Sequence, residues 1–209
     1  MVGEGVLLHC LGSDEVSEVL MINRRPLGLS HPKLKELLVS DFNKLEAHRE
    51  MLLNYDGCFY CEGVSSIGKN EADYTRITFD TTLNFAKVLA SINSSMVFNF
   101  VTGAHTKTDG AQMWQRVKGR TEDALIALGF RGQYNFRPGF MKPVKGQNNV
   151  RWFFKPIIAI LPYLIPKQTL TLNEVGQAMI NTITSGYGKQ RLEISDIKAL
   201  SKLRNETTY

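Results

Sequence analysis

Two glycines near the amino end of the sequence could bind a phosphate group. Gly3 and Gly5 lead directly into an apolar run with helical spacing at residues 6–11. Glycine lets the backbone approach a ligand closely, and the unpaired N–H groups at the start of a helix favour an anion. The pattern therefore predicts a phosphate-binding loop that opens a helix. A small-residue helix entry without a ligand is the alternative interpretation.

Three polar residues follow the next apolar run. Asn23, Arg24 and Arg25 come where this run ends. An acidic residue at such a strand end accepts a hydrogen bond from a ribose 2′-hydroxyl and repels a 2′-phosphate, whereas these residues offer donors and positive charge. If a dinucleotide binds here, they favour NADP(H) over NAD(H). Two solvated surface arginines are the alternative.

The cysteines and histidines do not indicate a metal or redox site. Cys58 and Cys61 form a CxxC within the apolar, aromatic segment GCFYCEGV. Three steps along a strand put the two sulfurs on opposite faces, about 10 Å apart. The histidines lack the spacing of metal ligands: His9, His31, His48 and His105. The chain has 3 cysteines, and an odd number does not indicate a disulfide framework. A reducing, cytoplasmic location is therefore favoured.

The elements that would position these residues alternate along the chain. Strands are predicted at 18–25, 37–42, 57–66, 95–104 and 132–140, and amphipathic helices at 73–92 and 113–129. Strands separated by helices of this length favour right-handed crossovers, so we expect an α/β fold with a Rossmann-like, doubly wound parallel sheet. Residues 1–209 are expected to form a single NAD(P)-binding domain, with 140–190 as a smaller substrate-side lobe.

One strand is missing from this pattern. In a sheet of order 3-2-1-4-5-6, the glycine loop follows the central first strand, which lies between strands 2 and 4. Its loss leaves two apolar strand edges unpaired in the core, which is costly. We therefore expect that the first strand and the start of the glycine loop are lost by truncation or by assignment of the start to an internal methionine. A rearranged sheet in which strands 2 and 4 close the gap is the alternative.

Composition limits the classes of partner. The chain has 209 residues, is 43% hydrophobic and carries a formal net charge of +5 from scattered lysines and arginines. This charge fits a pocket for an anionic small molecule and indicates a nucleic-acid groove only weakly. The most apolar stretch, 152–166, is interrupted by Lys155, Pro156 and Pro162, so it is too short to span a membrane. It is interpreted as a core helix, with a hydrophobic substrate lid or an interfacial helix on anionic lipid as alternatives.

Five segments together resemble the short-chain dehydrogenase/reductase superfamily, specifically its extended or atypical branch, labelled NAD-dependent epimerase/dehydratase-like. MVGEG at 1–5 is similar to the tail of the family's TGATGxxG loop, and YCEGVSS at 60–66 to its strand-4 signature. TFDTTLNFAKVL at 78–89 is similar to the family's helix after strand 4. VTGAHT at 101–106 is similar to the segment that ends in the catalytic serine, and FRPGF at 136–140 to the RPG turn. Their order and spacing carry the resemblance.

The resemblance implies an NADP-dependent oxidoreductase or epimerase that acts on a small carbonyl or hydroxyl substrate. If the stretch at 152–166 is a substrate lid, this substrate is apolar. The family's reaction uses a tyrosine phenolate and a lysine one helical turn later, YxxxK. Here the matching stretch is WQRVK, with Trp114 in place of the tyrosine and Lys118 retained. An indole does not ionise usefully near neutral pH, so Trp114 cannot serve as general acid and base. Either His105 supplies the proton, or the pocket binds without ordinary hydride chemistry.

The resemblance also implies roles for individual residues. Lys118 orients the cofactor ribose, Thr102 takes the serine position and polarises the substrate oxygen, and Trp114 shapes the pocket. Cofactor contacts are implied for residues at the expected strand ends: Gly3, Gly5, Asn23, Arg24, Arg25, Asp41, Phe42, Cys61, Glu62, Gly63, Lys118, Pro138 and Gly139. The competing interpretations are a non-catalytic dinucleotide-binding or interaction module and an inactive truncated product.

Overall fold

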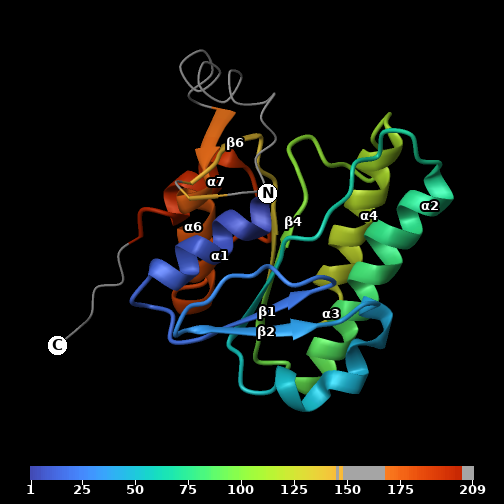
Figure 1. Cartoon of the computed structure of the whole chain (residues 1–209). Coiled ribbons are helices and arrows are strands. Elements are labelled where there is room, and N and C mark those ends of the chain that lie inside the picture. Colours follow the sequence, from blue (N-terminus) through green and yellow to red (C-terminus); the bar gives the residue numbers. More distant parts are fainter. Residues whose placement is uncertain (145, 148–167, 204–209) are drawn as a thin grey trace.

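A computed structural model describes residues 1–144, 146–147 and 168–203 (Figure 1). The apolar stretch at 152–166, with its three interpretations, lies outside these residues. Within the part of the chain that is described, no helix is long and apolar enough to cross a membrane.

Among the described residues, all the paired strands run parallel, and they form three separate sheets. The largest has the order β3 (Gly57–Tyr60), β4 (Val97–Val101), β5 (Gly132–Phe136) and β8 (Arg191–Leu192). The two smaller sheets pair β1 (Val19–Asn23) with β2 (Leu34–Leu38), and β6 (Phe140–Lys142) with β7 (Thr169–Thr171). Parallel strands with helical crossovers confirm the predicted α/β, Rossmann-like fold class.

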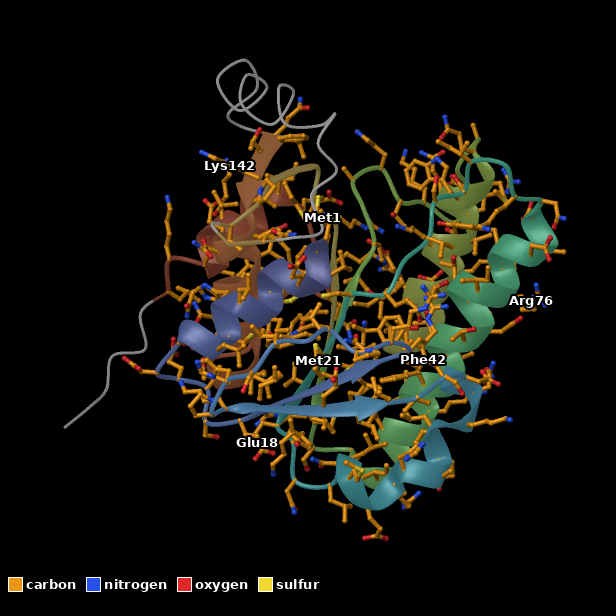
Figure 2. The ribbon with its side chains drawn as sticks, viewed as in Figure 1. Met1, Glu18, Met21, Phe42, Arg76 and Lys142 are labelled. Carbon is orange, nitrogen blue, oxygen red and sulfur yellow. The ribbon has the colours of Figure 1, made fainter. Side chains whose placement is uncertain are left out.

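Helices cover both faces of the four-stranded sheet (Figure 1). One layer contains α1 (Val2–Gly12), α6 (Leu172–Thr184) and α7 (Ile194–Leu200). The other contains the 3₁₀ segment η1 (Phe42–Leu52), α3 (Thr81–Ile92) and α4 (Met113–Ile126). Side chains along β4 alternate between the layers, because Val97 and Val101 pack against the first while Phe98 and Phe100 pack against the second. The side chains of both layers meet the sheet in the interior (Figure 2).

The predicted helix at 73–92 is confirmed, since α2 (Glu71–Thr75), the π-helical stretch η2 (Arg76–Asp80) and α3 follow one another without a break. The predicted strand at 37–42 is wrong in its position. β2 ends at Leu38, and Asp41 instead caps η1 by accepting a hydrogen bond from the Asn43 N–H at 3.0 Å. β2 lies at the edge of its sheet and exposes Lys35 and Glu36, so it lacks the apolar run on which the prediction depended.

The sheet is interrupted between β1 and β3. β1 pairs with β2 and β3 pairs with β4, and hardly any Cα atoms of β1 and β3 lie within 8 Å of each other. No described strand precedes α1. The alternative in which strands 2 and 4 close the gap is therefore wrong. Within the range 140–190, α6 packs against α1 and the four-stranded sheet, while β6 and β7 form their own small sheet.

Candidate functional site

The amino end of α1 lies beside the carboxyl end of β3. Cys61 directly follows β3, and a Cβ atom added to Gly3 would lie 3.3 Å from the Cys61 Cβ. The N-cap residue, Met1, has no side chain that could cap the first turn. The first backbone N–H groups of a helix have no partner within the helix and carry the positive end of its dipole, so they favour an anion. Gly3 thus permits a close approach between the uncapped amino end of α1 and the sheet.

Gly5 has a different role from Gly3. A Cβ atom on Gly5 would lie 2.4 Å from Leu172 Cδ1 at the start of α6. Its small size therefore allows α1 to pack against α6, two residues beyond the glycine that faces the strand end. The structure separates the two glycines that the sequence grouped in one loop.

Residues from three separate segments meet around Arg24, just beyond β1. The Arg24 guanidinium forms an ion pair with Glu62 at 3.2 Å and lies 5.8 Å from the centroid of the Phe42 ring. Tyr60 donates its hydroxyl hydrogen to the same carboxylate, with 2.9 Å between the oxygens. The predicted cofactor residues Arg24, Phe42 and Glu62 are therefore brought together. Part of the Arg24 charge is already balanced by Glu62.

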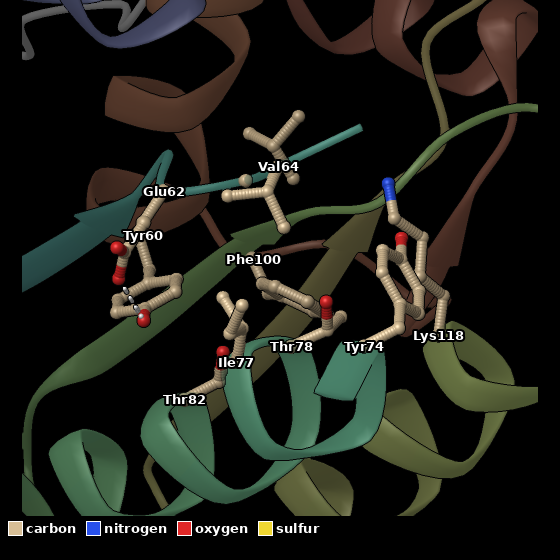
Figure 3. Close-up of a pocket in the computed structure, with 11 residues that line it drawn as sticks. Tyr60, Glu62, Val64, Tyr74, Ile77, Thr78, Thr82, Phe100 and Lys118 are labelled. Atoms are coloured by element: carbon tan, nitrogen blue, oxygen red, sulfur yellow. Dashed lines mark hydrogen bonds between the residues drawn. The ribbon is translucent and has the colours of Figure 1, made fainter. Parts of the chain in front are cut away.

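Lys118 lies in a small buried pocket between β3, β4 and the α2–α3 segment (Figure 3). The cavity has a volume of about 10 Å³, which is room for one water molecule. Glu62 and Gly63 line it together with Tyr74 and Lys118, and Figure 3 shows these last two on one wall. Burial lowers the pKa of the Lys118 ammonium, which donates a hydrogen bond to the Thr102 carbonyl oxygen at 2.6 Å.

Thr102 and Trp114 do not line this pocket. Thr102 is buried, and its hydroxyl donates to Glu122 Oε1 at 2.8 Å while lying 3.2 Å from the Phe136 carbonyl oxygen. The Trp114 indole N–H donates to the Gln112 side chain. The structure thus links Thr102 to Lys118 through the main chain and leaves Trp114 outside the pocket.

A second, larger cavity lies at the ends of β4 and β5. It has a volume of about 400 Å³ and brings His105 together with Gly139 and Glu193. His105 adopts a left-handed backbone conformation with φ of +67°, which is uncommon for residues other than glycine, although histidine adopts it more often than most. A Cβ atom on Gly139 would lie 2.9 Å from the Gln168 carbonyl oxygen, so only glycine fits there without movement. The Pro138 carbonyl oxygen accepts a hydrogen bond from the Ala104 N–H at 2.9 Å.

The remaining predicted residues lie at the same carboxyl edge. The Asn23 carbonyl oxygen accepts a hydrogen bond from the Val39 N–H at 2.8 Å, and Arg25 is exposed beside Arg24. Cys58 and Cys61 pack into opposite layers, as expected from their spacing. Burial raises the pKa of the Cys61 thiol to about 12. No group of residues that could hold a metal ion occurs among the described side chains.

The sequence did not reveal the buried ion pair beneath this edge. Glu122 in α4 is completely buried, and Arg137 donates two hydrogen bonds to it, from Nε at 3.0 Å and from an η nitrogen at 2.5 Å. Arg137 also pairs with Glu193 at 3.0 Å. Glu122 lies on the buried face of α4, between Val117 and Leu125. The helical spacing of these apolar residues is the sequence signal that could have identified Glu122 as buried.

The comparisons with known proteins agree with this fold. No family model and no curated protein matches the sequence. Among solved structures, a glucuronic acid dehydrogenase from Chromohalobacter salexigens is 16% identical, with a TM-score of 0.65 over 90% of this chain and 69% of that one. The Bordetella bronchiseptica enzyme WbmH, solved with NAD+, is 14% identical, with a TM-score of 0.64 over 91% and 70%.

A short chain dehydrogenase from Burkholderia cenocepacia, solved with NADP, is 11% identical, with a TM-score of 0.64 over 95% of this chain and 86% of that one. The chain therefore has the Rossmann-like fold seen in these dehydrogenases. The resemblance found in the sequence is confirmed at the level of the fold.

The Glu122–Arg137 pair generates a prediction about stability. Replacing Arg137 with methionine leaves the Glu122 carboxylate buried without its main counter-charge, so we expect the free energy of unfolding to fall by about 3 kcal/mol. Urea denaturation measures this change. The matched control is Arg76→Met, which removes an exposed pair with Asp73 on the outer side of the helical layer (Figure 2) and should cost less than about 1 kcal/mol. Equal effects of the two substitutions would contradict the assignment.

Proposed function

We propose that the chain binds a nicotinamide dinucleotide along the carboxyl edge of its parallel strands. The observation that carries the proposal is the uncapped amino end of α1 beside Cys61, where Gly3 leaves room for a close approach. This arrangement suits a pyrophosphate, because it supplies backbone N–H donors and a positive helix dipole at a strand end. Two of the solved proteins with this fold were determined with NAD+ or NADP.

The residues around this helix end fit the two halves of such a cofactor. On the β1 side, Arg24, Arg25 and Phe42 offer positive charge and an aromatic face for an adenosine phosphate. On the other side of β3, Lys118 supplies a buried ammonium for a ribose hydroxyl. When bound, the nicotinamide accepts or donates a hydride.

NADP(H) is the proposed coenzyme. Asn23, Arg24 and Arg25 place no acidic side chain directly at the end of β1, so nothing in this segment repels a 2′-phosphate. Glu62 pairs with Arg24, however, and a 2′-phosphate must share this guanidinium with the carboxylate. Arg25 then makes the larger difference between the two coenzymes.

The proposed reaction is an oxidoreductase or epimerase step on a small carbonyl or hydroxyl compound. Trp114 has no group that gains and loses a proton near neutral pH. An imidazole is a common general acid and base in enzymes, and His105 lines a 400 Å³ cavity beside Glu193 that is large enough for a small substrate. We therefore assign the proton transfer to His105. Thr102 would polarise the substrate oxygen only after its hydroxyl turns away from Glu122.

A non-catalytic dinucleotide-binding module is the second candidate function. The observation in its favour is that the hydroxyl of Thr102 and the indole N–H of Trp114 both already have partners within the protein. Binding and turnover experiments separate the two.

Cofactor binding is tested by titration of the protein with NADPH, followed by quenching of tryptophan fluorescence. Lys118→Met should weaken binding about tenfold, since a hydrogen bond from a charged donor is lost. Burial lowers the Lys118 pKa, so wild-type affinity should fall as pH rises through a range below the pKa of an exposed lysine, and the variant should lose this dependence. Lys87→Met, at an exposed position of α3, is the control and should bind like the wild type.

Coenzyme preference is tested with the double variant Arg24→Ala plus Arg25→Ala. Loss of two positive charges should weaken NADPH binding about tenfold or more and leave NADH binding nearly unchanged, because only NADPH carries the 2′-phosphate. Isothermal titration calorimetry with both coenzymes measures the two affinities. An unchanged NADPH affinity would remove the proposed preference.

Catalysis is tested by NADPH oxidation over a panel of aldehydes and ketones. His105→Gln should lower turnover about a hundredfold and leave NADPH affinity unchanged, since loss of a general acid typically has this effect. Trp114→Tyr should increase turnover if this position faces the nicotinamide. Saturable NADPH binding without any turnover would instead support the non-catalytic module.

A further inference from the structure

The loop that joins β4 to α4, residues 102–112, holds His105 in a tight turn (Figure 1). The turn runs from Gly103 to Thr106, whose N–H donates to the Gly103 carbonyl oxygen at 3.3 Å. The buried Thr106 hydroxyl donates to the same oxygen at 2.8 Å. His105 is the third residue of the turn, and glycine is the usual residue when φ at this position is positive. The protein thus keeps an imidazole where glycine would fit without strain.

Hydrogen bonds hold the backbone on both sides of His105. On one side, the Ala104 N–H donates to the Pro138 carbonyl oxygen at 2.9 Å, which ties the loop to the end of β5. On the other side, the His105 carbonyl oxygen accepts a hydrogen bond from Gln115 Nε2 in α4 at 2.9 Å. A side chain in a left-handed conformation persists only where its surroundings determine the backbone. These two contacts supply that determination.

Gln115 serves two partners with the two ends of one amide group. Its Nε2 atom donates to the His105 carbonyl oxygen, and its Oε1 atom accepts a hydrogen bond from the Gln112 N–H at 3.0 Å. The nitrogen can only donate and the oxygen can only accept, so the partners fix the orientation of the amide. One end therefore closes the start of α4, and the other end holds the turn that carries His105.

The rest of the loop is held against α4 by different residues. A Cβ atom on Gly110 would collide with the Gln115 side chain, and one on Gly119 would lie 2.5 Å from a backbone nitrogen of the loop. Both glycines therefore let the loop lie directly on the helix. Arg116 donates to two carbonyl oxygens at the far end of the loop, at 3.1 and 3.0 Å. Arg116 thus holds the far half of the loop, whereas Gln115 holds the half that contains His105.

We propose that Gln115 is a positioning residue for His105: its hold on the His105 carbonyl keeps the imidazole at the wall of the 400 Å³ cavity beside Glu193. The inference rests on the proposed proton transfer by His105. Without the Gln115 hydrogen bond, the turn can relax to negative φ, which is the more stable region for a residue with a side chain. The ring then points in another direction, and a misplaced proton donor loses much of its effect on the rate.

Two substitutions of Gln115 separate the two ends of its amide. Gln115→Glu keeps an oxygen that accepts from the Gln112 N–H and removes the donor to His105. Gln115→Lys keeps a donor for His105 and removes the acceptor at the helix start. In the first variant we expect the Cα and Cβ chemical shifts of His105, measured by NMR, to leave their wild-type values at an unchanged melting temperature. In the second we expect wild-type shifts and a melting temperature lower by about 2–4 °C.

Turnover provides the second readout. Gln115→Glu should lower kcat about tenfold and leave the KM and the NADPH affinity within about twofold of wild type, because only the placement of the proton donor changes. Gln115→Lys should keep kcat near the wild-type value. The matched control is Arg116→Met, which releases the far half of the loop and should change neither kcat nor the His105 signals.

Several results would overturn the assignment. Wild-type His105 signals in Gln115→Glu would show that the hydrogen bond does not position this residue. Equal losses in the Glu and Lys variants would assign the effect to the start of α4, and an equal loss in Arg116→Met would assign it to the loop as a whole. The NMR signals require neither coenzyme nor substrate. A wild-type protein without turnover therefore contradicts the proposed reaction, while the signals still decide the role of Gln115.

Discussion

The carboxylate of Glu122 is the group on which the arrangement of the site depends. It is buried without solvent contact in α4, and it accepts hydrogen bonds from Thr102 after β4 and from Arg137 after β5. Arg191, in β8, approaches the same carboxylate at 3.4 Å. A buried charge is tolerated only with such partners, so the ends of β4, β5 and β8 are held at fixed positions relative to α4. Lys118 lies one helical turn before Glu122, and its ammonium position follows from the same contacts.

Much of the fold was predictable from the sequence, because apolar runs and helical spacing report directly on burial. The parallel α/β class, the helix over 73–92 and the opposite orientations of Cys58 and Cys61 were predicted in this way. β2 was misplaced because an edge strand with exposed Lys35 and Glu36 lacks that signal. The pattern of residue types indicates which positions are buried and says little about strands that face solvent.

The candidate site was predictable only in outline. The ends of β1 and β3 were placed well enough to bring Arg24 and Glu62 together, although the ion pair between them was not foreseen. Phe42 lies beside Arg24 from the start of η1, and not from the predicted strand end. The packing of Gly5 against Leu172 was not foreseen, because glycine serves close helix packing and phosphate binding equally well. The Glu122–Arg137 pair was missed because its partners are 15 residues apart and on different elements. Such pairings depend on tertiary structure, which a local pattern does not contain.

The salt bridge between Arg24 and Glu62 belongs to two regions at once. It is part of the proposed adenosine end of the site, and it also bridges the two halves of the interrupted sheet. A bound anion that draws the guanidinium away from the carboxylate also removes a tether between those halves. Thermodynamic linkage makes this effect reciprocal: any event that tightens or loosens the sheet at this point alters the affinity for the anion by the same factor. Ligand choice and the mechanical integrity of the sheet are thereby coupled through a single side chain.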